Sequence, residues 1–225
     1  MQSRLGRSKR GEEWLVFSQS FLKIAEIGAR EMRDKKYDST STIEDLYVAT
    51  IYNIKHGIEA FTKSILVILG DTLLGKEDYS HDSVKEFMKV FDVIGKSKLE
   101  EVINQIQLTY NNDPKFLLKD SLSYPDLLFK LGKMGGLVHE YYTCSFIKDK
   151  IGSDYDVADT KNDAFRYPQN SLKVKLDYQK IIGRLNRTDI QKLIEDILEL
   201  ESVLYTFWLI VNYFDPSAKE GEISF

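Results

Sequence analysis

Two long segments in the first third of the chain repeat their apolar residues every three or four positions, and this repeat is the strongest constraint on the fold. In the first segment, from about residue 12 to residue 34, the repeat consists of Trp14, Phe17, Phe21, Ile24 and Ile27. This spacing places side chains on one side of an α-helix. The segment is therefore predicted to be a long helix that buries this stripe.

The second segment runs from about residue 43 to residue 69 and combines two kinds of stripe. Its large apolar residues recur at helical spacing: Ile54, Ile58, Phe61, Ile65 and Ile68. Beside them lie three small residues, Gly57, Ala60 and Ser64. Small side chains on one side of a helix let a neighbouring helix come close, so this segment is predicted to be a second long helix in close contact with another.

The rest of the chain continues in the same pattern. Further helices are expected from about Ser80 to residue 95, over 99–110, from near Pro125 to about residue 151, and from Thr188 to about residue 214. Three glycines, Gly132, Gly135 and Gly136, predict a kink or a close backbone contact. Residues 172–178 alternate between apolar and polar, which suggests a short strand. The predicted fold is an all-α, up-and-down helical bundle.

The domain organisation follows from the same pattern. Residues 1–11 are basic and lack an apolar repeat, so they are expected to form a flexible arm that either stays free or touches phosphate. Residues 12–215 form a single predicted domain, and residues 216–225 a tail. No apolar run approaches the roughly 20 residues that span a bilayer, and the single cysteine excludes an internal disulfide and a cysteine-rich zinc site. A cytoplasmic protein without a cofactor is expected.

The chemistry of the chain has to come from scattered residues, because no phosphate-binding loop and no H-E-x-x-H motif is present. The three histidines, His56, His81 and His139, lie in separate segments, so no metal site is predicted. His56 precedes Glu59 by three residues, and Glu59 precedes Lys63 by four. This spacing is typical of an exposed helix edge with an ion pair.

Four short motifs occur in a definite order. Glu59, Lys63 and Leu66 belong to the second long segment, and His81–Asp82 opens the next one. The stretch "MGGLVHEYY" carries His139, and "FRYP" ends at Pro168. Over residues 40–210 this order resembles the HEPN family (higher eukaryote and prokaryote nucleotide-binding domains). The resemblance implies an all-helical bundle with an additional N-terminal helix in this chain. It also implies a homodimer whose histidine helices face each other, with the glycines allowing close approach.

HEPN members that cleave RNA carry an arginine four to six residues before the histidine. In this chain the arginine position is occupied by Met134, and Lys133 lies one step earlier. Cleavage without a metal needs proton transfer, which a histidine can perform, and positive charge against the developing phosphorane. A lysine supplies a point charge but not the bidentate contact of a guanidinium. Lys133 and Arg166 are the candidate substitutes.

Three interpretations of His139 remain open: a structural histidine, a nucleotide- or RNA-binding group, and a catalytic residue. Arg166 and Tyr167 form either a packed loop or a cation-and-ring edge for a phosphate or base. Nearby basic residues favour the second interpretation. Tyr141 follows the histidine at the position that a partner nucleotidyltransferase modifies in some HEPN systems.

The resulting hypothesis is a non-catalytic HEPN-like protein that binds nucleotide or RNA, in a prokaryotic defence or toxin–antitoxin-like system with an antitoxin or nucleotidyltransferase as partner. The predicted ligand-binding residues are Arg166, Tyr167, Tyr141, His56 and Lys63. One alternative is a metal-independent endoribonuclease that uses His139 and Lys133. The other is a helical scaffold or interaction protein without a ligand.

Overall fold

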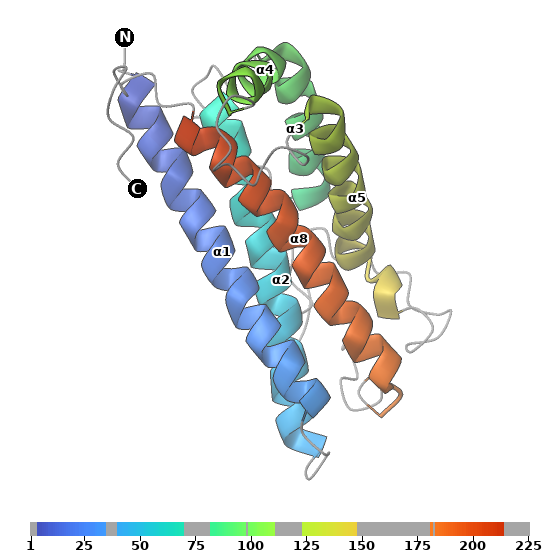
Figure 1. Ribbon diagram of the computed structural model, residues 1–225. Coiled ribbons are helices and arrows are strands. Elements are labelled where there is room, and N and C mark those ends of the chain that lie inside the picture. The colour runs from blue at the N-terminus through green and yellow to red at the C-terminus, as the bar shows by residue number, and fades with distance from the viewer. Residues whose placement is uncertain are drawn as a thin grey trace.

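The computed structural model describes residues 4–34, 40–69, 82–97, 99–110, 123–147, 181 and 183–213. Every regular element in these ranges is helical, which confirms the predicted all-α bundle (Figure 1). The predicted strand at 172–178 and the tail at 216–225 lie outside the described residues. So do Arg166 and Tyr167, and nothing tests their predicted role in binding.

The bundle is built from six described α-helices and one short 3-10 helix. They are α1 (Arg4–Asp34), α2 (Thr40–Leu69), α3 (Ser83–Lys96), α4 (Leu99–Tyr110), α5 (Tyr124–Tyr142), η1 (Ser145–Ile147) and α8 (Arg187–Tyr213). The long helices α1, α2 and α8 lie alongside one another, and α3, α4 and α5 cover the other side of α2 and α8 (Figure 1). Chain direction alternates between α1 and α2 and again between α5 and α8, as in an up-and-down bundle.

Helix α1 begins at Arg4, so it extends through most of the segment that was expected to be a flexible arm. Near this end of the helix, Gly11 lies against α2. A Cβ on Gly11 would come within 2.2 Å of Ile68 Cγ1, and the Gly11 carbonyl accepts a 2.9 Å hydrogen bond from the Ser64 hydroxyl. Gly11 therefore works as a packing position inside the helix and does not mark its start.

The predicted buried face of α1 is wrong. Phe17, Ile24 and Ile27 are more than half exposed. The core instead receives another stripe, which includes two alanines: Leu15, Leu22, Ala25, Ala29 and Met32. Burial of large apolar side chains contributes roughly 1.5–3 kcal/mol each. Ala25 and Ala29 bury less apolar surface than larger side chains would. They let the backbone of α1 come close to α2, and the additional contact between the two helices offsets part of that loss.

The predicted close packing on α2 is confirmed at its small residues. Gly57 lies against Leu22 and against the backbone of α1 at Ser18, whose hydroxyl donates a 2.7 Å hydrogen bond to the Gly57 carbonyl. Ser64 makes the corresponding bond to Gly11. Two buried serine hydroxyls thus link α1 to α2 at positions about two turns apart, and both are satisfied by backbone carbonyls.

Local signals place α3 and α5 as the sequence suggested, with small shifts. The N-cap of α3 is Asp82, whose carboxylate accepts from the Lys85 amide at 3.2 Å. The N-cap of α5 is Ser123, and Pro125 lies in its first turn, where a missing N–H costs nothing. Helix α5 continues through its three glycines. Gly135 makes the predicted close contact, because a Cβ added there would lie 3.3 Å from Phe87 Cε1.

Helix α8 begins one residue earlier than predicted and is capped by other groups than Thr188. The Asn186 side chain accepts from the Asp189 amide at 3.0 Å, and the Asp189 carboxylate accepts from the Asn186 amide at 2.8 Å. This reciprocal pair is a capping box, which satisfies two of the amides that a helix start leaves unpaired. Asp189 is therefore held at the first turn of α8.

Candidate functional site

His139 lies on α5 and is exposed. Its backbone carbonyl accepts hydrogen bonds from the Thr143 amide at 2.9 Å and from the Thr143 hydroxyl at 2.6 Å, which end the helix. The same side of α5 carries Gly132 and Gly136, where an added Cβ would meet nothing within 4 Å. The imidazole of His139 is thus open to a ligand and is not packed in the core.

Lys133 also lies on α5 but points in another direction than His139. Its Nζ lies 3.5 Å from Glu199 Oε1 on α8 and 5.1 Å from the centre of the Phe129 ring. Six residues of α-helix correspond to a rotation of about 600°, which leaves Lys133 and His139 about 120° apart around the axis and about 9 Å apart along it. The two predicted catalytic residues are therefore not brought together.

Tyr141 is buried in the contact between α5 and α8. Its hydroxyl donates a 3.0 Å hydrogen bond to Asp196 Oδ2, which also accepts from Lys192 Nζ at 2.8 Å. Lys192 Nζ in turn lies 3.0 Å from Glu140 Oε1. Tyr141 is thus a buried member of a polar network. Its hydroxyl is not presented to a modifying partner.

His56 on α2 is nearly enclosed by aromatic rings. Its ring centre lies 4.1 Å from that of Tyr52 and 5.4 Å from that of Phe21 on α1. Its Nδ1 lies 3.8 Å from Glu59 Oε2. These contacts link α1 to α2, so the described surroundings of His56 give it a structural role.

Lys63 lies on the same contact between α1 and α2, two turns further along α2. It donates a 2.6 Å hydrogen bond to Glu59 and lies 5.0 Å from the centre of the Trp14 ring. The predicted Glu59–Lys63 pair is confirmed. Like His56, Lys63 is engaged within the bundle, on a different helix from His139.

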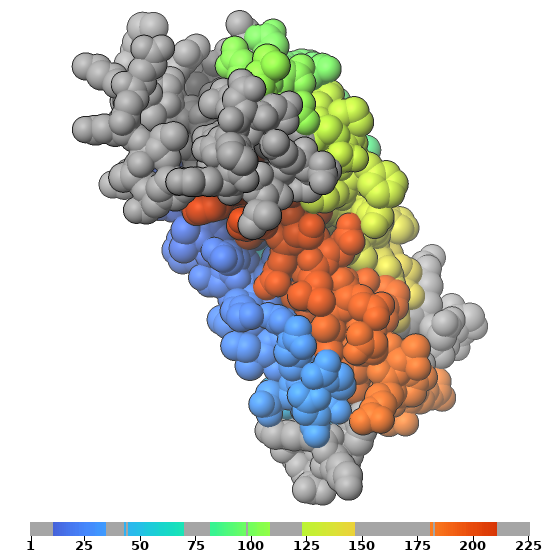
Figure 2. Space-filling view, in the orientation of Figure 1, coloured from blue at the N-terminus to red at the C-terminus, as the bar shows by residue number. Residues whose placement is uncertain are grey.

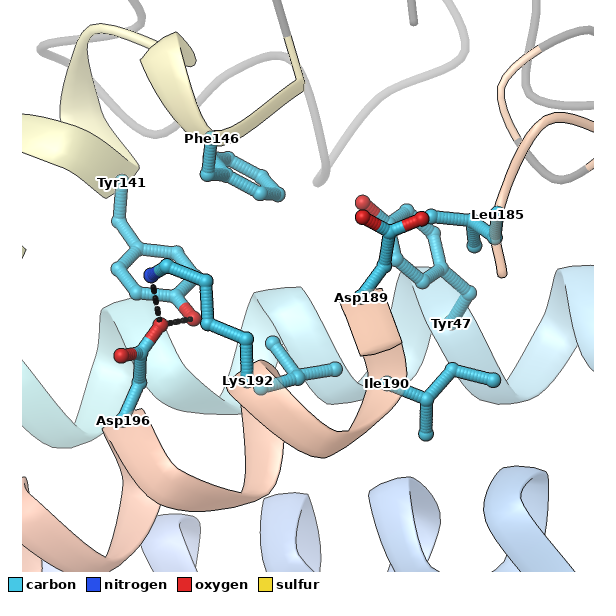
Figure 3. Close-up of a pocket in the computed structure, with 9 residues that line it drawn as sticks. Tyr47, Tyr141, Phe146, Leu185, Asp189, Ile190, Lys192 and Asp196 are labelled. Carbon is cyan, nitrogen blue, oxygen red and sulfur yellow. Dashed lines mark hydrogen bonds and ion pairs between the residues drawn. The ribbon is translucent and has the colours of Figure 1, made fainter. Parts of the chain in front are cut away.

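A small pocket lies where α5, η1 and the start of α8 meet α2 (Figure 3). Its volume is about 40 Å³. The described lining residues are Tyr47, Tyr141, Phe146, Leu185, Asp189, Ile190, Lys192, Leu193 and Asp196. The backbone at Cys144 has a φ of 55°, which turns the chain after α5 and brings the Phe146 ring to 4.8 Å from the Tyr141 ring. The pocket is thus closed on one side by two aromatic rings.

The electrostatics of the pocket are set by burial. Burial raises the pKa of the Asp196 carboxyl, although the hydrogen bond from Lys192 opposes this effect. Burial likewise raises the phenolic pKa of Tyr141 and of Tyr47, and nearby carboxylates add to it. For Lys192, burial lowers the pKa but hydrogen bonds to Asp196 and Glu140 outweigh it, so the ammonium form is favoured. The phenols remain protonated and the lysine remains charged at neutral pH.

Sequence reasoning missed the pocket except for Tyr141. Lys192 and Asp196 stand at a spacing of four on a predicted helix, which is a signal for a local ion pair. Nothing in the sequence indicates that Tyr141, 55 residues earlier, meets this pair. Tyr47 carries no local signal beyond being an aromatic residue in a helix.

A second feature of the surface is the outer face of α1, which consists of Val16, Phe17, Ile24 and Ile27. These four side chains are 57%, 56%, 53% and 55% exposed. They follow one another at steps of one, seven and three residues, so they lie on one side of the helix. Isolated exposed apolar residues are common, but a contiguous group on one helix is typical of an interaction surface.

Helix α8, which packs beside α1, also carries exposed aromatic residues. Glu201 on α8 interacts electrostatically with Lys23 and Glu26 of α1, so charged groups lie at the junction of the two helices. Tyr205 lies one turn after Glu201, is 54% exposed, and stacks on Trp208 with ring centres 6.1 Å apart. Helices α1 and α8 lie side by side where both are visible in Figure 2.

Within the described residues, no group of three or more metal-ligating side chains is placed to hold an ion, and no helix combines the length and apolarity needed to cross a bilayer. Comparison of the chain with family models, with curated proteins and with solved structures finds no match. The HEPN resemblance therefore continues to depend on the sequence motifs alone.

Proposed function

We propose that this chain is a helical interaction protein, which assembles through the outer face of α1 and whose partner at that face is a second copy of itself. The observation that carries the proposal is the exposure of Val16, Phe17, Ile24 and Ile27, each more than half accessible on one helix. Covering apolar surface contributes about 25 cal/mol per Å², so a partner that buries this face is favoured.

The length and spacing of the face suit a partner helix. Helix α1 has 31 residues, which corresponds to about 46 Å. Phe17 and Ile24 are seven residues apart, the repeat that keeps apolar side chains on one seam between two packed helices. Ile27 follows three residues later. Ser20 lies between Phe17 and Ile24 and is exposed, which leaves room for side chains of the partner.

The charge distribution along α1 favours a second copy in antiparallel orientation. Residues 4–13 contain four basic and two acidic residues, whereas residues 25–34 contain two basic and three acidic residues. A twofold axis across the middle of the outer face, near residue 22, places the basic end of one helix beside the acidic end of the other. A parallel pair would bring the two basic ends together. Twofold pairing is also the commonest symmetry of soluble oligomers.

The contacts of the predicted ligand-binding residues support ranking an interaction role above nucleotide binding. His56, Lys63 and Tyr141 each contact side chains of another helix, and the pocket beside Tyr141 has a volume of about 40 Å³. That volume is close to the share of one or two water molecules and is far below the several hundred Å³ of typical ligand sites. A nucleotide does not fit there.

Cysteine cross-linking tests the assembly and its direction. The single native cysteine, Cys144, is buried, so any disulfide formed on the surface comes from the introduced cysteine. Ser20→Cys lies near the proposed twofold axis and is expected to form a disulfide-linked dimer under mild oxidation. Glu13→Cys is expected to link to Glu31→Cys in a mixture. It should not link to itself, because the antiparallel arrangement separates two copies of residue 13 by about 27 Å.

Two results would contradict the proposed assembly. If Ser20→Cys stays monomeric under oxidant, the outer face of α1 does not meet its own copy. If Glu13→Cys links to itself as readily as to Glu31→Cys, the helices are parallel and the charge argument is wrong. An exposed cysteine on α4, Gln105→Cys, provides the background level of collisional cross-linking.

A second candidate function, RNA or nucleotide binding, is favoured by the open side of α5. Phe129, Gly132, Gly136 and His139 recur at steps of three and four, so they share one side of the helix. Phe129 is 65% exposed, and Lys133 lies over its ring. An exposed ring with a neighbouring cation is the arrangement on which single-stranded nucleic acid stacks. The uncovered glycines would let a base or sugar approach the helix backbone.

Binding of a labelled single-stranded RNA of mixed sequence, measured by fluorescence anisotropy without divalent metal, tests this candidate. Phe129→Ala is expected to weaken binding about fivefold or more, since one base stacked on a ring contributes roughly 1–3 kcal/mol. His139→Ala is expected to weaken it as well, and Leu108→Ala on α4 serves as the control for an exposed apolar residue. No saturable binding by the unmodified protein would rule the candidate out. Gel analysis of the same samples tests the endoribonuclease alternative.

A further inference from the structure

A charged cluster lies where α1 meets α8, beside the outer face of α1. Lys23 and Arg30 both donate to the carboxylate of Glu26, which is buried. Glu201 on α8 interacts electrostatically with these three groups. Within the described part of the chain, however, both cations form their ion pairs with Glu26 and neither forms one with Glu201. One copy of the chain therefore brings no cation of this cluster into close contact with Glu201.

The surroundings of Glu201 make a closer cation favourable. Burial raises the pKa of the Glu201 carboxyl, and the charge of Glu26 raises it further, although Lys23 and Arg30 oppose this effect. The negative charge of Glu201 is thus incompletely compensated within one copy. Water screens a partly buried carboxylate less than an exposed one, so a cation that comes close to Glu201 interacts with it more strongly.

Lys23 is placed to supply such a cation to a partner. It lies three residues after Ser20 and four before Ile27, along the edge of the outer face that borders α8. Its side chain is 62% exposed. An ammonium group has three donors, and the bond to Glu26 uses one of them. Lys23 can therefore bond to a carboxylate of a partner while it keeps its own contact with Glu26.

The proposed twofold pairing brings Lys23 of one copy towards α8 of the other. A twofold axis between two antiparallel helices is perpendicular to both, so both copies of α8 lie on the same side of the pair. With the axis near residue 22, the two copies of Lys23 are about 3 Å apart along the helix direction. Two ammonium groups at the same level repel each other unless carboxylates accompany them. Glu201 of each copy lies on that side of the pair.

We propose that, in the dimer formed through the outer face of α1, Lys23 of each copy forms an ion pair with Glu201 of the partner subunit. This inference rests on the proposed self-assembly and adds α8 to its interface. The apolar side chains supply the buried surface, whereas the two ion pairs make the interface specific for a second copy of this chain. Charges at the rim of an interface act in this way, because they oppose partners that lack the complementary group.

Charge reversal, followed by sedimentation velocity over a range of protein concentrations, tests the pairing. Lys23→Glu and Glu201→Lys, each alone, replace two attractive contacts per dimer by two repulsive ones. Each variant is expected to dimerise about tenfold more weakly than the unmodified protein. In a one-to-one mixture of the two variants, the mixed dimer has an attractive contact at both places. The mixture is therefore expected to regain the affinity of the unmodified protein.

The mixture distinguishes a contact between copies from a contact within one copy. If Lys23 and Glu201 act on each other only within one chain, mixing restores nothing, because each variant keeps its own like-charged pair. Glu195→Lys reverses an exposed acidic residue on the same helix and is the matched control. It should dimerise as the unmodified protein does. Urea unfolding of each variant establishes that it is folded before the measurement.

Two results would overturn the ion pairs and leave the self-assembly in place. One is a pair of single variants that dimerise as strongly as the unmodified protein. The other is a pair of weakened variants whose mixture does not recover. A monomeric unmodified protein would instead contradict the proposed assembly and the ion pairs together. Recovery in the mixture, with an unaffected Glu195→Lys variant, is the result that supports the inference.

Discussion

Gly57 of α2 and Leu22 of α1 are so close that a Cβ on Gly57 would lie 2.7 Å from Leu22 Cδ2 and 2.8 Å from Leu22 Cγ. Gly57→Ala is therefore expected to force the two helices apart at this position. Overpacking of this kind costs about 1–3 kcal/mol. The free energy of unfolding, measured with urea, is expected to fall by this amount.

Gly136→Ala on α5 is the matched control, because a Cβ there meets nothing within 4 Å. Alanine is favoured over glycine inside a helix by about 1 kcal/mol, so this variant is expected to be more stable than the unmodified protein. If Gly57→Ala is as stable as Gly136→Ala, the described approach of α1 to α2 is incorrect.

Tyr141→Phe removes the hydroxyl that donates to Asp196 and leaves the ring in place. Among the described residues, the side chain of Asp196 then accepts a hydrogen bond only from Lys192. Hydrogen bonds to a charged group contribute about 1.5–3 kcal/mol, so the free energy of unfolding is expected to fall within this range. Tyr205→Phe is the control, since its ring is exposed on the same helix as Asp196. An equal loss in both variants would contradict the described network.

The stability of the protein is expected to depend on pH through Asp196. Burial raises the pKa of this carboxyl above its ordinary value of 3.8, so the folded chain binds the proton more tightly than the unfolded chain. The stabilisation that protonated Asp196 gives to the folded state is therefore fully present below pH 3.8. It is lost as the pH rises through the pKa of the folded state. Relative to the unmodified protein, Asp196→Asn should gain stability between acidic and neutral pH, measured by urea unfolding in a pH series.

The pKa of Glu26 on α1 is shifted in the opposite direction to that of Asp196. Its hydrogen bond from Lys23 is the main reason that its pKa lies below the ordinary value of 4.5, and Arg30 adds to the effect. The stabilisation is present above pH 4.5 and is lost as the pH falls through the folded pKa. Glu26→Gln should therefore lose stability, relative to the unmodified protein, as the pH rises. Equal pH dependence in the two variants would refute the pKa assignments.

The helices were largely predictable from the sequence, because their apolar periodicity and several caps are local signals. The face that α1 buries was not. Its sequence contains two stripes at helical spacing, one with Phe17 and Ile24 and the other with Leu22 and Ala29. Hydrophobicity favours the first stripe. The second is buried because Gly57 of α2 leaves room for Leu22, so the choice of face depends on a residue of another helix.

The pocket was predictable only at Tyr141, because its polar contacts join distant parts of the chain. Tyr141 meets Asp196 across 55 residues, and Tyr47 reaches the same pocket from α2. The separation of Lys133 from His139, in contrast, follows from their spacing on one helix. Periodicity predicts direction around a helix axis, but it does not predict which helix comes to lie beside it.

The central claim, that the outer face of α1 joins two copies of the chain, is tested most directly by sedimentation velocity over a range of protein concentrations. The unmodified protein and Met88→Gln, which alters an exposed residue on α3, are expected to form dimers. The double variant Phe17→Gln, Ile24→Gln is expected to remain monomeric at the same concentrations. A monomeric unmodified protein, or a double variant that still forms dimers, would contradict the claim.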